Sequence, residues 1–407
     1  MENRYDKYKD SGIAWIGEIP EHWKVKKGKN LFKKEERPVR DNDEIVTCFR
    51  DGEVTLRSNR RIDGFTNAMK EVGYQGVRRG DLVIHNMDAF AGAIGVSDSD
   101  GKSTPVYSVC TPKNNVEANV YYYAYLLRSY ALGGVIQSLA KGIRERSTDF
   151  RYKEFGDLYY QQPPIEEQQS IASYLDQKCG EIDKLITLQE EMITKLQSYK
   201  QSVITEAVTK GLDKNLPLKD SGIEWIGEIP EHWSVVKIKY LAKIKSGDSI
   251  SSNEIMQEGI YEVYGGNGLM GFCNKKNVDG VNIIIGRVGA LCGNVRLISE
   301  SKFITDNALI LNCFDNALYS YMYIMLKAAN LNNLNTSNAQ PLITSSKVLN
   351  VSLPIPPLSE QQSIANYLDQ KCSEIDELIS IKQQKIEKLK DYKKSLIFEC
   401  VTGKRKV

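Results

Sequence analysis

Two stretches of the chain carry apolar residues at the spacing of an amphipathic helix. In residues 164–211 these residues recur every seven positions, with a break at Gln189, and the same phasing returns in residues 357–407. No Gly or Pro interrupts the first stretch between Glu181 and Lys210. Each stretch therefore predicts a helix of roughly 40 residues, or about 60 Å at 1.5 Å per residue. The positions expected at the interface between the two helices are Leu175, Ile182, Leu196, Val203, Leu368, Ile375, Leu389 and Leu396.

A helix of this length needs a partner, and the other copy is the obvious one. We expect the two helices to form an antiparallel coiled coil with a pseudo-twofold arrangement. Further apolar positions, among them Ile186 and Ile379, widen the stripe beyond a two-helix seam. Two interpretations remain open. The extra positions cover the segments between the helices, or they form a surface for another protein.

The helices belong to a longer internal repeat. Residues 9–23 return as residues 219–233 with one change, Ala14 to Glu224, and residues 168–179 return from Gln361 onward. The segments between these blocks, called inserts below, share no evident similarity. A repeated frame of such blocks and helices that holds two unlike inserts suits recognition of two different targets at a fixed spacing. The organisation predicted is an anchor at 1–23, an insert at 24–163, a helix at 164–211, a second anchor at 212–233, a second insert at 234–356 and a second helix at 357–407.

Each anchor block contains two tryptophans, Trp15 and Trp23 in the first copy, with turns at Gly17 and Pro20. Large aromatic side chains contribute most where they are buried. The block is therefore interpreted as a docking peptide that fixes each insert against a helix. Packing inside the protein is favoured over a contact with another protein.

Both inserts mix strand-like and helix-like runs. Residues 80–85 and 281–286 predict strands, whereas residues 121–130 and 319–329 predict helices. The fold class expected is α/β (α+β) for both inserts, joined by the two long helices. Strand order does not follow from these patterns.

Composition narrows the classes of function. Hydrophobic residues make up 41% of the 407 residues, which supports buried cores, yet the longest apolar runs are too short to span a bilayer. Residues 1–4 lack the profile of a signal peptide. The eight cysteines form no C-x-x-C pair, so reduced thiols fit better than disulfides or a zinc site. A cytoplasmic protein without membrane contact is expected.

The net charge of +2 is unevenly distributed. Residues 24–160 hold 23 Lys and Arg against 18 Asp and Glu, and residues 234–353 hold 11 against 8. The basic surplus therefore lies in the inserts and not in the repeated frame. Because cation–phosphate contacts dominate affinity for a duplex, this distribution favours DNA-facing inserts. It is mild evidence, since many domains show such a surplus.

The sequence contains no catalytic pattern. Residues 95–103 look like a phosphate-binding loop, but the second glycine comes one position late and Asp100 stands in its place. Residues 264–268 are glycine-rich without a following helix signature, and His22, His85 and His232 are scattered. The chain is therefore expected to bind, with no catalytic residue, no metal and no cofactor of its own.

Polar loops in the inserts are candidate DNA contacts. Arginine pairs with guanine edges or phosphates, and Asn and Gln match adenine edges in the major groove. The alternative for any single residue is an ordinary solvated side chain. The candidates are Arg50, Arg57, Arg60, Arg61, Lys141, Arg144 and Arg146 in the first insert, and Asn335, Ser337, Asn338 and Gln340 in the second.

The repeated blocks resemble those of a known family. The Asp-Ser-Gly-Ile-x-Trp-Ile-Gly-x-Ile-Pro-x-x-Trp block and the Pro-Pro-x-x-Glu-Gln-x-x-Ile-Ala-x-Tyr-Leu-Asp block, the latter at 163–176 and 356–369, are similar to those of specificity subunits of type I restriction–modification systems. The second insert also resembles one class of target-recognition domain through residues 286–290, which adds Arg287 to the candidates, and residues 305–308. The first insert departs from that class.

The resemblance implies a division of labour. Each insert would read one half of a bipartite site in double-stranded DNA, and the helices would set the spacing, with half-site centres about one duplex turn (~34 Å) apart. Two methyltransferase subunits would dock on the frame and methylate adenine N6 with S-adenosylmethionine. Restriction subunits would add ATP- and Mg-dependent translocation and cleavage.

Two other classes of function are alternatives. An enzyme with its own recognition domains would need a cofactor loop and an Asn/Asp-Pro-Pro-aromatic motif, whereas the Pro-Pro pairs here follow Gln162 and Ile355. A coiled-coil adaptor between proteins, without DNA readout, is the second alternative. Steeply salt-dependent duplex binding separates it from a DNA reader.

Overall fold

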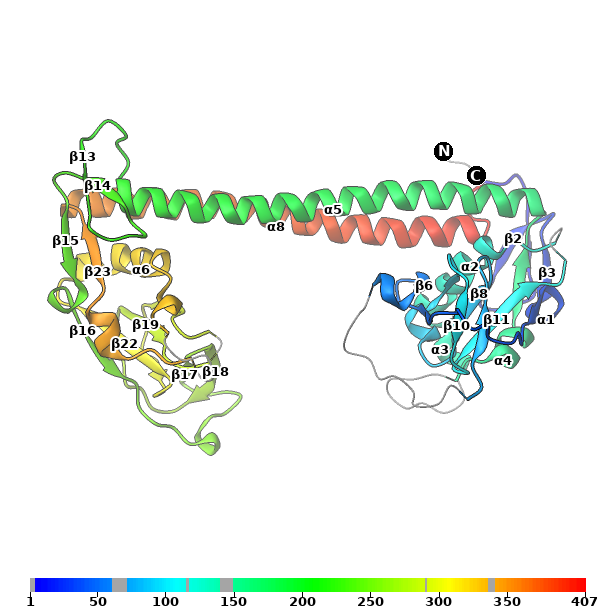
Figure 1. Ribbon diagram of the computed structural model, residues 1–407, viewed down its shortest axis with the longest axis horizontal. Coiled ribbons are helices and arrows are strands. Elements are labelled where there is room, and N and C mark those ends of the chain that lie inside the picture. The colour runs from blue at the N-terminus through cyan, green and yellow to red at the C-terminus, as the bar shows by residue number, and fades with distance from the viewer. Residues whose placement is uncertain (1–3, 61–71, 115–116, 140–148, 290, 336–340) are drawn as a thin grey trace. The chain divides into compact units, whose positions relative to one another are not determined.

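The computed structural model describes residues 4–60, 72–114, 117–139, 149–289, 291–335 and 341–407. The chain divides into two compact units. Unit 1 comprises Met1–Gln189 together with Gln384–Val407, and unit 2 comprises Glu190–Gln383. Each unit therefore contains one anchor, one insert and parts of both long helices (Figure 1).

The insert of unit 1 is built on a four-stranded antiparallel sheet of order β4-β11-β8-β9. Helix α2 packs against β8 and β9, and β12 returns to pair with β3 at the base of the insert. Two small ribbons, β5-β6 and β10-β7, extend the insert. The bounds are β3 Lys24–Lys27, α1 Gly28–Leu31, β4 Phe32–Lys34, β5 Val46–Cys48, β6 Val54–Leu56, β7 Gln75–Val77, β8 Leu82–His85, β9 Ile94–Val96, β10 Gly101–Ser103, β11 Tyr107–Pro112, α2 Val120–Leu132, α3 Val135–Leu139, α4 Tyr152–Asp157 and β12 Tyr159–Gln162.

The insert of unit 2 has an antiparallel sheet of order β16-β22-β19-β20. Helix α6 packs against β19 and β20, and β23 pairs with β15. A second sheet has the order β18-β17-β21. The bounds are β15 Ser234–Lys237, β16 Ala242–Ser246, β17 Tyr261–Gly265, β18 Gly268–Cys273, β19 Asn282–Gly286, β20 Val295–Ile298, β21 Phe303–Ile304, β22 Ala308–Cys313, α6 Tyr319–Ala328, α7 Ser345–Leu349 and β23 Ser352–Ile355.

The two inserts thus share one strand order although their sequences show no evident similarity. The register agrees as well, because Tyr107 pairs with His85 in unit 1 and Ala308 pairs with Gly286 at the corresponding place in unit 2. A sheet requires apolar side chains on its buried face and not particular ones, so the same fold accepts unlike sequences. The predicted strands and helices of both inserts are confirmed as β8, α2, β19 and α6.

Both predicted long helices are confirmed, as α5 Ile165–Lys210 and α8 Leu358–Val401. In unit 1 the Lys393 Nζ lies 2.6 Å from the Asp183 carboxylate, and in unit 2 the Lys200 Nζ lies 2.6 Å from the Asp376 carboxylate. Asp376 and Lys393 are the repeat equivalents of Asp183 and Lys200, each 193 positions later. The two helices therefore contact each other reciprocally, as in an isologous antiparallel pair.

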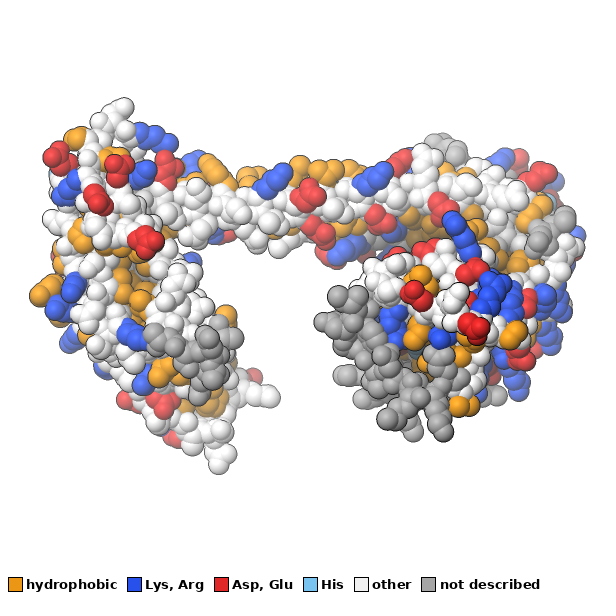
Figure 2. Space-filling view, viewed as in Figure 1, with side chains coloured by type: hydrophobic (Ala, Val, Ile, Leu, Met, Phe, Trp, Pro, Cys, Tyr) orange, Lys and Arg blue, Asp and Glu red, His pale blue; other side chains and the backbone are white. Residues whose placement is uncertain are grey.

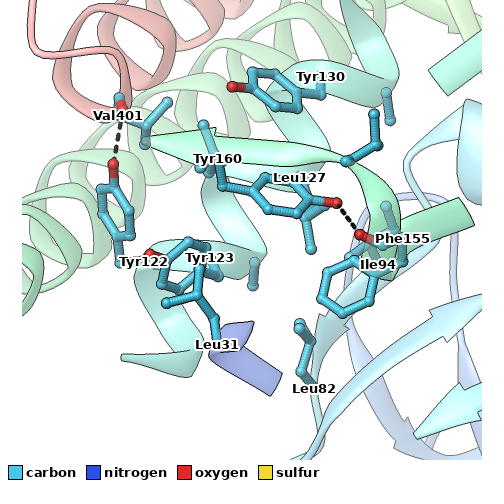
Figure 3. Packing of buried hydrophobic residues seen from close by; sticks show 14 of the residues in the cluster. Leu31, Leu82, Ile94, Tyr122, Tyr123, Leu127, Tyr130, Phe155, Tyr160 and Val401 are labelled. Carbon is cyan, nitrogen blue, oxygen red and sulfur yellow. Dashed lines mark hydrogen bonds between the residues drawn. The ribbon is translucent and has the colours of Figure 1, made fainter. Parts of the chain in front are cut away.

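The predicted interface positions on the helices are largely buried. Leu175, Ile182 and Leu396 belong to the core of unit 1, together with Tyr122 and other residues of the insert. Figure 3 shows the Tyr122 hydroxyl donating to the Val401 carbonyl at the end of α8, at 2.9 Å. Of the further apolar positions, Ile186 and Ile397 pack against this core and Ile204 packs against the core of unit 2, as the first of the two interpretations predicts, whereas Ile379 is only half-buried.

Unit 2 repeats this arrangement. Val203 and Leu368 belong to its core, and α6 lies between α5 and the sheet (Figure 1). Ile375 is buried as well, whereas Leu196 and Leu389 are half-buried. Among the residues described, no helix is both long and apolar enough to cross a bilayer.

Each anchor is a hairpin tied to the start of a long helix. The hairpins are β1 Tyr8–Asp10 with β2 Glu18–Pro20, and β13 Leu218–Asp220 with β14 Glu228–Pro230. Trp23 is fully buried and its indole donates to the Glu167 carboxylate at 3.0 Å, and Trp233 donates to Glu360 at the same distance. Trp15 and Trp225 are exposed instead. Internal packing is therefore confirmed for only one tryptophan of each pair.

Candidate nucleic-acid interface

Two of the arginines predicted to contact DNA from unit 1, Arg50 and Arg60, are paired with acidic neighbours. Arg50 lies 2.8 Å from Asp88, and Arg60 lies 2.7 Å from Asp51 while its guanidinium stacks over the Phe49 ring. The Arg57 Nε donates to the Thr47 hydroxyl at 3.3 Å. Surface ion pairs contribute at most about 1 kcal/mol, so a phosphate could replace these carboxylates at little cost. Arg61, Lys141, Arg144 and Arg146 lie outside the described residues.

In unit 2, two of the predicted residues lie close together. Arg287 follows β19, and its carbonyl accepts from the Ile343 amide at 2.9 Å. The backbone amide of the neighbouring Leu342 donates to the Asn335 side-chain oxygen at 3.2 Å. The Asn335 side chain is therefore bonded to the segment that also contacts Arg287. The Arg287 guanidinium reaches the Ser246 hydroxyl at 3.4 Å. Ser337, Asn338 and Gln340 lie outside the described residues.

Unit 1 contains a basic pocket that the sequence analysis missed. Its volume is about 740 Å³, and it opens beside the ends of β4 and β8. We define it by its cations Lys34, Arg37, Arg151 and Lys153 and by the rings of Tyr74, Tyr107 and Tyr152. Among the residues that the structure describes, Glu36 is the one acid in its lining. These residues come from separate segments of the chain, so no sequence spacing could have indicated the pocket.

The floor of the basic pocket is held by hydrogen bonds and an ion pair. The Gln75 side-chain amide donates to the Tyr107 carbonyl at 2.7 Å, and the Ser108 hydroxyl donates to the Asn86 side chain at 2.8 Å. Burial raises the pKa of Tyr107 to about 12, so its hydroxyl is neutral at physiological pH. The Arg37 guanidinium is paired with the buried Asp81 carboxylate. The floor is thus held by hydrogen bonds and an ion pair, and the exposed charges are Lys34, Arg151 and Lys153 at the rim.

The described residues offer no group of three or more His, Cys, Asp and Glu side chains suited to a metal ion. The cysteines are separate thiols, and burial raises the pKa of both Cys313 and Cys400 to about 12. A thiol with so high a pKa stays protonated at neutral pH and is a poor nucleophile.

Comparison with known proteins shows which class of protein this chain is similar to. Residues 230–391 match the family model described as the type I restriction modification DNA specificity domain. The chain is 27% identical to the putative type I restriction enzyme MjaX specificity subunit of Methanocaldococcus jannaschii, over 96% of each chain. It is 33% identical to the type I restriction enzyme EcoprrI specificity subunit of Escherichia coli over 133 residues, 32% of this chain and 33% of that one.

Solved structures agree on the fold. A chain from a study of complex assembly and conformational transition in a type I restriction–modification system superposes with a TM-score of 0.74, at 18% identity, over 94% of this chain and 98% of that one. The HsdS subunit of Thermoanaerobacter tengcongensis gives a TM-score of 0.55, also at 18% identity, over 95% and 98%.

The fold and the matched domain thus define a protein of DNA sequence specificity. Residues 230–391 carry the matched type I restriction modification DNA specificity domain, and the chain is similar along its length to specificity subunits of type I restriction enzymes. Subunits of this family are generally non-catalytic and assemble with other restriction–modification subunits and DNA. The predicted domain boundaries and DNA-contact residues stay predictions.

Proposed function

We propose that this chain reads a bipartite site in double-stranded DNA, one half with each recognition domain, and that the paired helices set the distance between the halves. Methylation of adenine N6 with S-adenosylmethionine, and cleavage with ATP and Mg, would take place in partner subunits. The chain itself would contribute recognition and assembly in the cytoplasm.

One observation carries the proposal of two readers. The repeated frame holds two domains of the same strand order whose sequences differ. At the position after β8 or β19, for example, unit 1 has the buried Asn86, whereas unit 2 has the partly exposed Arg287. A guanidinium that reaches DNA can bind guanine edges or phosphates. Two copies of one scaffold with different side chains are what two different half-sites require.

The helices support docking of two copies of one partner. Apolar side chains are exposed at equivalent positions of both repeats, with Leu185 at 45% and Leu378 at 48%, and Tyr199 at 58% and Tyr392 at 51%. Leu188 and Ile381 form a third such pair. Hydrophobic side chains are visible along the paired helices in Figure 2. Since these side chains are not needed for packing within the chain, we assign them to two methyltransferase subunits.

Methylation mapping tests the proposal. The chain is co-expressed with a methyltransferase subunit of the same system, and modified adenines are mapped across the host DNA. A bipartite consensus with one modified adenine in each half is expected. A continuous consensus would contradict two separate readers. Absence of salt-dependent duplex binding would instead favour the adaptor alternative.

A matched pair of variants tests the docking face. Leu185→Glu with Leu378→Glu should abolish co-purification of the methyltransferase subunit, because a buried unpaired carboxylate is strongly unfavourable. The control is Gln197→Glu with Ser373→Glu, which adds the same charge at exposed polar positions of the same helices. Equal co-purification with both variants would contradict the assignment.

A further inference from the structure

Asn86 and Arg287 occupy the same place in their respective domains. The Asn86 amide donates to the Val106 carbonyl at 2.9 Å, and the Arg287 amide donates to the Asn307 carbonyl at 3.0 Å. The Asn86 carbonyl accepts from Phe150 at 3.0 Å, as the Arg287 carbonyl accepts from Ile343. Both residues directly follow the central strand, β8 or β19. The backbone therefore fixes one equivalent position in each domain, whatever side chain stands there.

This equivalence connects the basic pocket with the predicted DNA contact of unit 2. The sequence predicts that Arg287 contacts DNA. Its counterpart in unit 1, Asn86, lines the basic pocket. Asn86 is buried and accepts from Ser108, so it belongs to the floor. In unit 1 the groups free to reach a ligand are therefore the rim cations.

The charges of the basic pocket suit a polyanion. Among the described residues its lining holds four cations and one acid, Glu36, while Asp81 and Asp149 outside the lining pair with Arg37 and Arg151. Lys34 lies 2.8 Å from Glu36, and Arg151 lies 2.6 Å from Asp149, both in exposed pairs that a phosphate can replace. Lys153 is exposed beside them. Flexible lysines on a rim act as point charges for phosphates.

A second sizeable pocket of unit 1 does not have this character. It lies between α2 and the paired helices, with a volume of about 640 Å³. Its lining contains three cations, Arg128, Lys393 and Lys394, but also four acids. Those acids are Asp51, Glu53, Asp176 and Asp183. A DNA backbone would be repelled there, so the basic pocket is the better surface of the two.

We propose that the basic pocket is where unit 1 holds the sugar–phosphate backbone of its half-site, with Lys34, Arg151 and Lys153 contacting phosphates. The inference rests on the proposed function, because it locates the DNA on one of the two readers. Contacts to phosphates position a protein on the duplex and carry no sequence information of their own. The pocket therefore supplies affinity, and base reading falls to other side chains of the domain.

Duplex binding by the full chain in its methyltransferase complex tests this assignment. The test variant is Lys34→Gln with Lys153→Gln. The control variant is Lys29→Gln with Lys33→Gln, which removes the same charge from exposed lysines of the same domain outside the pocket. Affinity is measured from 50 to 300 mM salt for the mapped site and for a duplex whose unit 1 half-site is scrambled.

Two lost phosphate contacts should reduce the slope of log affinity against log salt by roughly 2, since each contact contributes about 0.9. The loss in affinity should be the same factor for both duplexes, and hydroxyl-radical protection should weaken over one half-site only. Arg287→Gln should instead weaken protection over the other half.

The outcomes separate the two proposals. If wild-type complex binds with a steep salt dependence but test and control variants behave alike, the basic pocket is not the backbone contact. Loss confined to the intact site would also overturn it, because that result means base reading. If the wild-type complex shows no salt-dependent binding, the proposed function itself fails. Since Lys34 and Lys153 are exposed, unchanged thermal unfolding of the variants verifies their folding.

Discussion

The two copies of the anchor allow a quantitative test of how the frame is held together. Glu167 accepts from the Trp23 indole at 3.0 Å, from His22 at 2.6 Å and from the Tyr5 hydroxyl at 2.9 Å. Glu360 accepts from Trp233 and His232 at the same distances. Asn215 stands where the second copy would have Tyr5. The substitutions Glu167→Ala and Glu360→Ala therefore compare the loss of a carboxylate that has three hydrogen-bond donors with the loss of one that has two.

The expected magnitudes follow from these contacts. Each substitution leaves a fully buried indole N–H without its acceptor, which costs about 1–3 kcal/mol. The bonds from the partly exposed histidines add little. Burial and the bond to Glu167 raise the pKa of Tyr5, so its hydroxyl is a neutral donor whose loss adds about 1 kcal/mol. We expect about 3 kcal/mol for Glu167→Ala and about 2 kcal/mol for Glu360→Ala.

Amide hydrogen exchange measures each anchor separately. Mass spectrometry of peptides covering β2–β3 and β14–β15 reports the local free energy of opening in each unit. Glu167→Ala should lower it only in the first peptide and Glu360→Ala only in the second, with the larger change in the first. Equal changes, or changes below about 0.5 kcal/mol in both, would contradict the view that these carboxylates secure the anchors.

Three further predictions concern the thiols, a glycine contact and the predicted DNA loop. Cys400, whose pKa is raised by burial to about 12, should resist iodoacetamide at pH 8 in the native protein and react in urea; rapid native labelling seen by mass spectrometry would contradict its burial. Gly95→Ala should lower the melting temperature, because the added Cβ would lie 1.9 Å from the Gly52 carbonyl oxygen, whereas Gly180→Ala in open helix surface should stabilise by up to about 1 kcal/mol. Arg144→Ala with Arg146→Ala should weaken methylation that depends on one half-site only, and equal weakening of both halves would count against independent readers.

The candidate site shows where sequence reasoning reached its limit. Arg287 was identified by its local motif, and the structure places it beside the loop that contains Asn335. The basic pocket had no such motif, because Lys34, Tyr107 and Lys153 meet only after the sheet has formed. Nor could the sequence show that Arg50 and Arg60 are paired with acids from other turns of the chain.

The sequence by itself determined the frame of this protein. Apolar residues at every seventh position specified both long helices, and the repeated blocks specified that the anchor occurs in two copies. These signals can be read from one sequence because they are local and periodic. Only the tertiary structure decided that the two inserts share one strand order, and that Asn86 and Arg287 occupy equivalent positions. Strand pairing and pocket formation depend on contacts between residues far apart in the chain, and such contacts leave no spacing pattern for a single sequence to reveal.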